Sequence, residues 1–196
     1  DEMVIRTKRT RIRPRGEHQR DYVRKIRRFD INFGVGPAGT GKTWLAVACA
    51  VDALERNEVQ RILLVRPAVE AGEKLGFLPG DLAEKIDPYL RPLYDALNER
   101  LGGKRLKALM QDGTIEIAPV GFRRGRTLNN AFSVIDEAQN CNYGQLKMLL
   151  TRLGWNCTMV MTGDPDQSDL LPELSGLKEV AARLDTLDDV AVVRLS

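Results

Sequence analysis

Short apolar runs alternate with longer amphipathic stretches along most of this chain. Apolar runs of about four to eight residues that end at Gly or at polar residues are typical of buried β-strands. They predict strands at residues 31–35, 61–65, 115–118, 131–135, 158–162 and 190–195. The stretches between them predict helices at residues 17–28, 44–56, 81–101, 104–111, 143–153 and 173–184. Because strands that alternate with helices form a parallel sheet flanked by helices on both faces, we expect an α/β domain.

Three segments depart from this alternation. Residues 1–16 are highly charged and predict an N-terminal arm or an edge strand ahead of a domain at 17–196. Residues 66–81 form a long Pro- and Gly-rich loop, and a loop of that length inside a domain is usually functional or disordered. The helix expected at 81–101 contains Pro88 and Pro92, which would kink it or split it.

Composition excludes several classes of protein. The chain has 196 residues, which fits one domain, and 43% of them are hydrophobic. Its three Cys form no CxxC pair and it has one His, so zinc sites, multi-His metal sites and a disulfide framework are not expected. It has neither the roughly 20-residue apolar run of a membrane span nor the apolar core of a signal peptide. We therefore expect no membrane association and a cytoplasmic location.

The positive charge is concentrated near the start of the chain. Residues 6–28 carry eleven Lys and Arg against two acidic residues, whereas the chain from Phe29 onward is mildly acidic. Such a basic segment predicts a contact with RNA or DNA phosphates. A solvated arm that packs on an acidic body explains the same pattern, and the sequence leaves both open.

A phosphate-binding motif follows the strand expected at 31–35. It matches G-x-x-x-x-G-K-[ST], in which glycines turn backbone N–H groups onto phosphate oxygens and the next helix points its positive end at them. The Lys reaches the β- and γ-phosphates and the Thr hydroxyl ligates Mg²⁺. The expected ATP-binding residues are Gly36, Pro37, Ala38, Gly39, Thr40, Gly41, Lys42 and Thr43.

Two further polar motifs follow later strands. Asp136 and Glu137 end the strand at 131–135, and we expect Asp136 to hold Mg²⁺ and Glu137 to polarise the attacking water. On its own, the segment TGDPDQ at 162–167 has a composition typical of a turn. Beside the other two motifs it predicts that Gln167 senses the γ-phosphate. The carboxyl ends of parallel strands meet at one edge of the sheet, so all three motifs are expected there.

Taken together, these segments resemble the PhoH-like family of phosphate-starvation-inducible ATPases. The most specific match is RPAVEAGEKLGFLPGD at 66–81, which P-loop proteins in general lack. The other matching segments are GPAGTGKT, PYLRPLYDAL, RGRTLNNAF, IDEAQN, LTRLG and TGDPDQSDL. The chain departs from the family at Cys141 to Tyr143 and in GDPDQSDLLPE, and it ends before a segment that family members usually carry, so we expect a truncated C-terminal end.

The resemblance implies a single RecA-like P-loop domain, a three-layer sandwich related to the core of superfamily 1 helicases. It implies that Gln19 reads the adenine and that the protein acts in RNA metabolism. It also implies an endoribonuclease partner, either a YbeY-like enzyme or a PIN-type domain, and assembly into a homo-oligomeric ring.

Phosphoryl transfer gains greatly from an arginine at the γ-phosphate, and in a ring a neighbouring subunit would supply it. The candidates for such an arginine finger, or for an RNA contact, are Arg66, Arg123, Arg124, Arg126 and Arg152. A solvated loop or an RNA phosphate contact would also explain Arg123, Arg124 and Arg126, and a structural lid would explain the segment that begins at Arg66.

The motifs favour an ATPase that remodels RNA or an RNA–nuclease complex. A P-loop kinase for a small substrate is the weaker alternative, because Glu137 positions water rather than an acceptor. A module that uses ATP to assemble a ring and recruit a nuclease, with little turnover, needs the same motifs and stays open.

Overall fold

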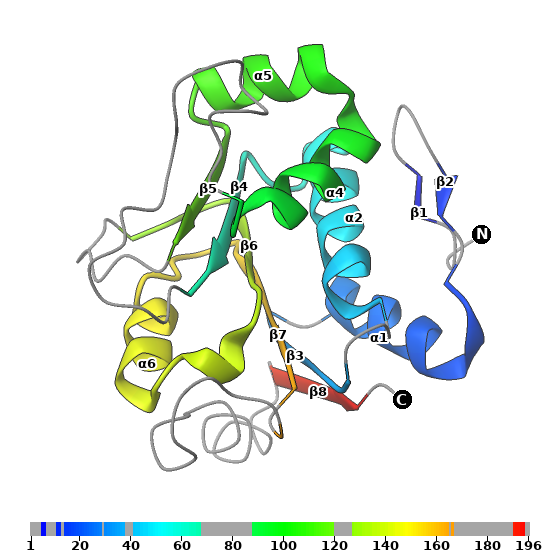
Figure 1. The fold of residues 1–196 in the computed structure, drawn as a ribbon, viewed down its shortest axis with the longest axis vertical. Helices are drawn as coiled ribbons and strands as arrows, with labels where there is room; N and C mark the ends of the chain where they lie inside the picture. The colour runs from blue at the N-terminus through cyan, green and yellow to red at the C-terminus, as the bar shows by residue number, and fades with distance from the viewer. Residues whose placement is uncertain are drawn as a thin grey trace.

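A computed structural model describes most of the chain. It covers residues 5–6, 11–12, 14–28, 30–37, 41–67, 88–119, 127–164, 166 and 190–194. Within these residues the fold is an α/β sandwich built on one central sheet (Figure 1).

Within the described residues the central sheet has six strands, and every neighbouring pair is parallel. Their spatial order is β5 (Ile115–Pro119), β4 (Arg61–Arg66), β6 (Ala131–Ile135), β7 (Thr158–Gly163), β3 (Ile31–Val35) and β8 (Val190–Arg194). The last of the predicted strands, β8, pairs with β3 over its full length. This arrangement confirms the α/β parallel sheet expected from the alternation of strands and helices.

Helices cover both faces of this sheet. One face carries α1 (Gly16–Arg28), α2 (Lys42–Glu55), α4 (Arg91–Leu101) and α5 (Gly103–Gln111), whereas α6 (Tyr143–Thr151) lies on the other (Figure 1). A short 3₁₀ helix, η1 (Ala138–Asn140), joins β6 to α6. The result is the expected three-layer sandwich.

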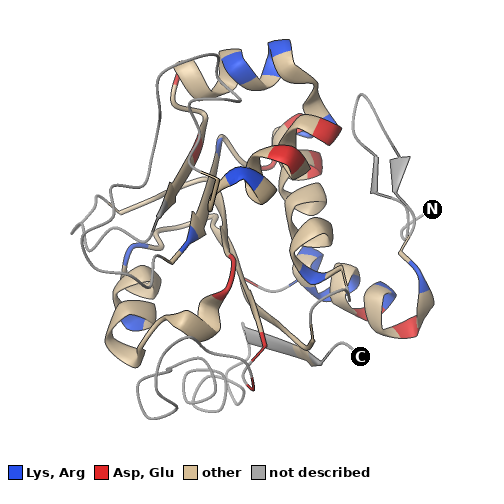
Figure 2. Cartoon of the chain, in the orientation of Figure 1, with Lys and Arg blue, Asp and Glu red and all other residues tan. Residues whose placement is uncertain are grey.

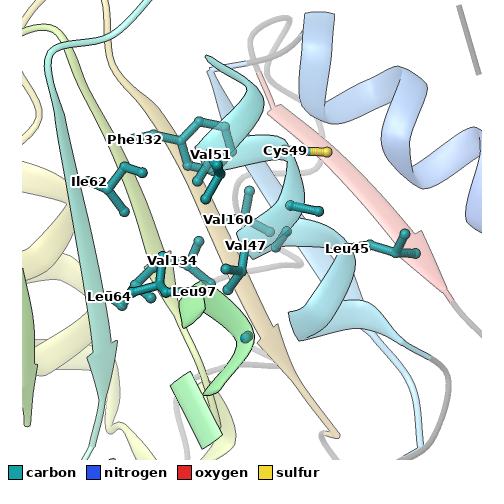
Figure 3. Packing of buried hydrophobic residues seen from close by; sticks show 14 of the residues in the cluster. Leu45, Val47, Cys49, Val51, Ile62, Leu64, Leu97, Phe132, Val134 and Val160 are labelled. Carbon is teal, nitrogen blue, oxygen red and sulfur yellow. The ribbon is translucent and has the colours of Figure 1, made fainter. Parts of the chain in front are cut away.

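Two hydrophobic clusters fill the space between the layers. Successive side chains of a strand point to opposite faces, so Ile62 and Leu64 of β4 pack under α2 and α4, whereas Leu63 and Val65 pack with α6. Figure 3 shows the first cluster, in which apolar side chains of α2 meet those of β6 and β7. Burial on both faces explains why these strands read as unbroken apolar runs.

Some boundaries differ from the sequence expectation. Residues 1–16 contain two short strands, β1 (Ile5–Arg6) and β2 (Arg11–Ile12), which pair antiparallel in a sheet of their own. Within the helix expected at 81–101, which Pro88 and Pro92 would kink or split, residues 88–90 form a turn and α4 begins at Arg91, and residues 81–87 lie outside the described part of the chain. Pro92 stands in the first turn of α4, where a missing N–H costs nothing. Helix α6 ends at Thr151 rather than at 153. The helix expected at 173–184 lies outside the described residues.

Charged residues are unevenly distributed over the fold. Lys and Arg gather on α1 and α5, whereas acidic residues stand at the carboxyl ends of β6 and β7 (Figure 2). In the part of the chain that the structure describes, none of the helices has the length and hydropathy of a transmembrane span.

Candidate nucleotide-binding site

The phosphate-binding motif joins β3 to α2. The N–H of Gly36 donates to the carbonyl of Gly163 at 3.0 Å, which holds the start of the loop against β7. Gly41 precedes the first residue of α2 with φ 80°, a left-handed conformation that suits glycine. Helix α2 therefore begins at Lys42 and directs its unpaired N–H groups toward the loop. Ala38, Gly39 and Thr40, three of the expected ATP-binding residues, lie outside the described part of the chain.

Lys42 is held at both ends. Its ammonium group donates to the carbonyl of Pro37 at 3.1 Å, so the side chain folds back over its own loop. Its backbone carbonyl accepts from the hydroxyl of Tyr22 in α1 at 2.8 Å. The Tyr22 ring is fully buried against Gly34, where an added Cβ would lie 2.7 Å from the ring. The packing of α1 on β3 thus positions the start of α2.

Gln19, the expected adenine-reading residue, also lies beside this loop. Its side-chain oxygen accepts from the N–H of Arg15 at 2.7 Å. Its amide nitrogen is 3.2 Å from the position that a Cβ on Gly41 would occupy. Helix α1 therefore brings Gln19 next to the phosphate-binding loop.

Asp136 connects three segments that are distant in sequence. Its Oδ1 accepts from the Thr43 hydroxyl at 2.7 Å and from the Thr162 hydroxyl at 3.2 Å, and the two hydroxyls are 2.9 Å apart. Its N–H donates to Val65 at 2.7 Å, which extends the β4–β6 pairing by one bond. Strands β6 and β7 and helix α2 therefore converge on one carboxylate.

Glu137 adopts a left-handed conformation, with φ 56° and ψ 39°. Such a conformation costs a residue with a side chain about 1–2 kcal/mol, and it turns the chain sharply away from β6. The side-chain amide of Gln139 donates to Glu137 Oε2 at 3.1 Å, and its oxygen accepts from the N–H of Asp164 at 3.2 Å. Gln139 thus links the expected water-polarising carboxylate to the end of β7.

A pocket of about 380 Å³ opens over these residues. Its polar side is formed by the start of α2 and by the carboxyl ends of β6 and β7, and its apolar side by Trp44 and the first turns of α4. The described residues that line it are Gly41, Lys42, Thr43, Trp44, Pro92, Leu93, Ala96, Asp136, Glu137, Gln139, Gly163 and Asp164. Lys42 is the single basic residue among them.

Trp44 forms part of a small cluster at the rim of this pocket. Its indole N–H donates to Glu99 at 3.1 Å, and the Arg100 guanidinium lies 4.6 Å from its ring centre. Burial, opposed in part by Glu99, lowers the pKa of Arg100. Trp44 as a whole is still 38% exposed, so this aromatic residue faces solvent in part next to the phosphate-binding loop.

The arginines proposed from sequence are spread over the domain. Arg66, at the end of β4, forms ion pairs with Asp136 at 3.5 Å and Glu137 at 3.4 Å. Arg152 follows α6, and its carbonyl accepts from Leu128 just before β6 begins, at the opposite edge of the sheet. Arg123, Arg124, Arg126 and Gln167 lie outside the described residues.

Several residues of the site were not expected from sequence. Tyr22, Tyr89 and Gln139 carry hydrogen bonds that shape it, and Thr162 shares Asp136 with Thr43. Gln139 and Thr162 stand inside motifs that were recognised, so their places next to Asp136 and Gly163 were a usable signal. Nothing local in the sequence marks Tyr22 or Tyr89, because their contacts depend on packing.

The residues present fit a nucleotide with Mg²⁺. A hydroxyl and a carboxylate, from Thr43 and Asp136, are oxygen ligands of the kind that Mg²⁺ prefers, and sites for this ion commonly use one or two carboxylates beside substrate phosphates. The start of α2 supplies N–H donors and Lys42 a positive charge for the phosphates.

Comparison with known proteins agrees with this geometry. A family model described as "PhoH-like protein" matches residues 11–196. A "PhoH-like protein" of Bacillus subtilis (strain 168) is 51% identical over 196 residues, which are all of this chain and 61% of the relative. A "PhoH-like protein" of Mycobacterium tuberculosis (strain H37Rv) is 54% identical over 186 residues, 94% of this chain and 53% of the relative. "Protein PhoH" of Escherichia coli (strain K12) is 45% identical over 93% of this chain and 52% of its own length.

Among solved structures, the chain is similar to a Sulfolobus solfataricus SWI2/SNF2 ATPase core in complex with dsDNA. The TM-score is 0.53 at 17% identity, over 93% of this chain and 45% of that one. This likeness confirms a RecA-like P-loop fold. The chain spans about half to three fifths of the length of the curated relatives named above. On the family match and these identities, the chain belongs to the PhoH-like protein family.

Proposed function

We propose that this domain binds Mg-ATP in the pocket above α2 and hydrolyses it. The observation that carries the proposal is the 2.7 Å hydrogen bond between Thr43 and Asp136, which joins the phosphate-binding motif to the carboxylates after β6. A chance match to either motif would not require the two to meet at a single pocket.

The protein's own residues would divide the work as follows. The start of α2 and Lys42 bind the phosphates, and Thr43 and Asp136 hold the metal ion. Mg²⁺, when bound, would neutralise phosphate charge and polarise the oxygens of the transferred group. Glu137 stands next to Asp136 at the pocket, where its carboxylate can orient a water molecule and accept its proton.

We further propose an RNA partner. Helix α1 ends in Lys25, Arg27 and Arg28, and the chain before it is rich in arginine. Such a surface would bind phosphates through charge, with strong salt dependence. The Sulfolobus structure holds dsDNA, which supports nucleic acid as a class of partner for this fold. The resemblance to the PhoH-like family also supports action beside an endoribonuclease, of the YbeY or PIN type, in a homo-oligomeric ring.

A second function, ATP-dependent assembly with little turnover, has one observation in its favour. Among the described residues that line the pocket, the single cation is Lys42. Arg152 stands at the far edge of the sheet, so it would reach a γ-phosphate only on a neighbouring subunit. Under this alternative, nucleotide would drive association of subunits and recruitment of the nuclease.

Steady-state ATP hydrolysis with and without single-stranded RNA tests the proposal, using wild type and Glu137→Gln. We expect activity that rises with RNA and falls by at least about a hundredfold in the variant, since the amide cannot accept a proton. Equal inactivity of both proteins, with nucleotide-driven association on a sizing column, would favour the assembly function instead.

Nucleotide binding can be measured separately from turnover. The chain has two tryptophans, Trp44 at the pocket and Trp155, which is 70% exposed and belongs to the turn before β7. Trp155→Phe would leave Trp44 as the single fluorescent reporter. We expect ATP to change its emission, and the Lys42→Ala variant to need a much higher ATP concentration for the same change.

A further inference from the structure

Arg66 contacts both carboxylates of its own domain. Its Nε lies 3.5 Å from Asp136 Oδ2 and its Nη2 lies 3.4 Å from Glu137 Oε1. The side chain is 18% exposed, so these charges interact in a partly dehydrated setting. The contacts follow from the sheet, because β4 pairs with β6 in a register that places Val65 beside Ile135.

Tyr89 contacts the third nitrogen of the same guanidinium. Arg66 Nη1 donates to the Tyr89 carbonyl at 3.0 Å, and the guanidinium carbon lies 4.7 Å from the centre of the Tyr89 ring. The Tyr89 hydroxyl donates to the carbonyl of Pro67. One residue therefore fixes Arg66 by a hydrogen bond, by a cation–π contact and through the adjoining backbone.

The carboxylates are divided between partners in a way that leaves them oriented. Oδ1 of Asp136 accepts hydrogen bonds from Thr43 and Thr162, and Oδ2 forms the ion pair with Arg66. Oε1 of Glu137 forms the ion pair with Arg66, and Oε2 accepts a hydrogen bond from Gln139. Arg66 is the one described residue with ion pairs to both, and its planar fork suits two acceptors at once.

We propose that Arg66 is a positioning residue that orients Asp136 and Glu137 of its own domain, and that Tyr89 holds Arg66 in place for this task. The inference rests on the proposed hydrolysis. It assigns Arg66 a role in cis, in contrast to an arginine finger donated to a neighbouring subunit or a contact with RNA.

The first test separates binding from chemistry. Arg66→Gln should lower kcat by about tenfold to a hundredfold, since small misplacement of a catalytic group has effects of that size. The KM for ATP should stay within about twofold, because the loop and Lys42 bind the phosphates. Arg66→Lys keeps the charge without the fork and should recover part of kcat. Arg61→Gln, at the exposed start of the same strand, is the matched control and should behave as wild type.

Tyr89 variants test the second half of the proposal without touching the carboxylates. Tyr89→Leu removes the ring and the hydroxyl and should lower kcat several-fold with KM preserved. Tyr89→Phe keeps the ring under the guanidinium and should lose less. A parallel fall in kcat and rise in KM in all these variants would indicate a merely structural role and would overturn the proposal.

A mixing experiment distinguishes cis from trans. Arg66→Gln protein carries an intact Glu137, and Glu137→Gln protein carries an intact Arg66. If Arg66 acted on a neighbour, mixed assemblies would contain complete sites and activity would return. We expect the mixture to be no more active than the two variants assayed apart, and recovered activity would overturn the role in cis.

Unfolding experiments provide a readout that does not depend on turnover. Tm is measured for Arg66→Gln, Glu137→Gln and the double variant, at protein concentrations where the chain is monomeric. A direct contact predicts that the double variant's Tm shift departs from the sum of the single shifts, and additive shifts would contradict it. If wild type fails to hydrolyse ATP at all, the proposed function fails, whereas this cycle still reports on the contact.

Discussion

The hydroxyl of Thr43 donates to Oδ1 of Asp136 across 2.7 Å, although 93 positions separate the two residues in the chain. Thr43→Val keeps the shape of the side chain and removes this donor. We expect the variant to lose most of the gain in ATP affinity that Mg²⁺ provides, and to fold with a stability cost of about 1 kcal/mol. Thr43→Ser should retain the gain. ATP titrations with Mg²⁺ and with EDTA check this, and an undiminished effect of Mg²⁺ in Thr43→Val would contradict it.

Gln139 connects Glu137 to the backbone of Asp164 through the two ends of its amide. Gln139→Met has a similar size and keeps neither hydrogen bond, so Glu137 should lose one of the two side-chain contacts that orient it. We expect kcat to fall by about tenfold with little change in KM, measured by steady-state hydrolysis.

Gln145 is the matched control for Gln139. It exchanges hydrogen bonds with Asn142 in the capping box of α6 and lies outside the pocket. Gln145→Met should cost about 1 kcal/mol of stability and leave kcat unchanged. Equal losses of kcat in the two variants would mean that Gln139 acts through general stability rather than through Glu137.

The site was predictable from sequence where a motif directly follows a strand. Thr43 and Asp136 were both assigned in this way, because parallel strands end at a common edge and polar residues there must meet. The order of the strands was not predictable, and this order places β7, with Thr162, between β6 and β3. The three-way contact of Thr43, Asp136 and Thr162 therefore required the structure.

Contacts made by packing were also beyond the reach of the sequence. The helix that carries Tyr22 was predicted, yet no local pattern indicates that its ring packs on Gly34 and that its hydroxyl donates to the start of α2.

Helix α6 ends two residues before the predicted boundary at 153, and the cause is local. The N–H of Arg152 pairs with Leu149, which closes a tighter turn than the α-helix, so Gly154 lies beyond the end.

Gly34 and Tyr22 make a test of packing at the phosphate-binding loop. A Cβ at residue 34 would lie 2.7 Å from the buried Tyr22 ring. We expect Gly34→Ala to destabilise the fold by about 1–3 kcal/mol in urea unfolding, the usual cost of overpacking. Tyr22→Leu should relieve part of that cost in the double variant.

Gly144→Ala is the control for this substitution. Gly144 lies in α6, where an added Cβ would be 3.4 Å from the nearest atom, an ordinary contact. Alanine there should stabilise the helix by about 0.5–1 kcal/mol. If Gly34→Ala were as well tolerated as Gly144→Ala, the close contact between Tyr22 and β3 would be wrong.

The buried cysteines should differ in reactivity between the folded and the unfolded protein. Burial raises the pKa of Cys49 and of Cys141 from 9.0 to about 12. The thiolate is the reactive form, so Cys49 and Cys141 should react slowly with a thiol reagent at pH 8 in the folded protein and rapidly in urea. Fast labelling of Cys49 in the folded protein at pH 8 would contradict its burial.

Because the pKa of both thiols is raised in the folded state, the free energy of unfolding should fall at high pH. Below pH 9 both thiols are protonated in the folded and the unfolded chain, and their contribution is fully present. Between about pH 9 and 12 the unfolded chain releases protons that the folded chain retains, so stability falls as pH rises. The urea midpoint should therefore drop between pH 8 and pH 10.5. It should drop less in the Cys49→Ala, Cys141→Ala double variant, and an identical drop in both proteins would assign the effect to other groups.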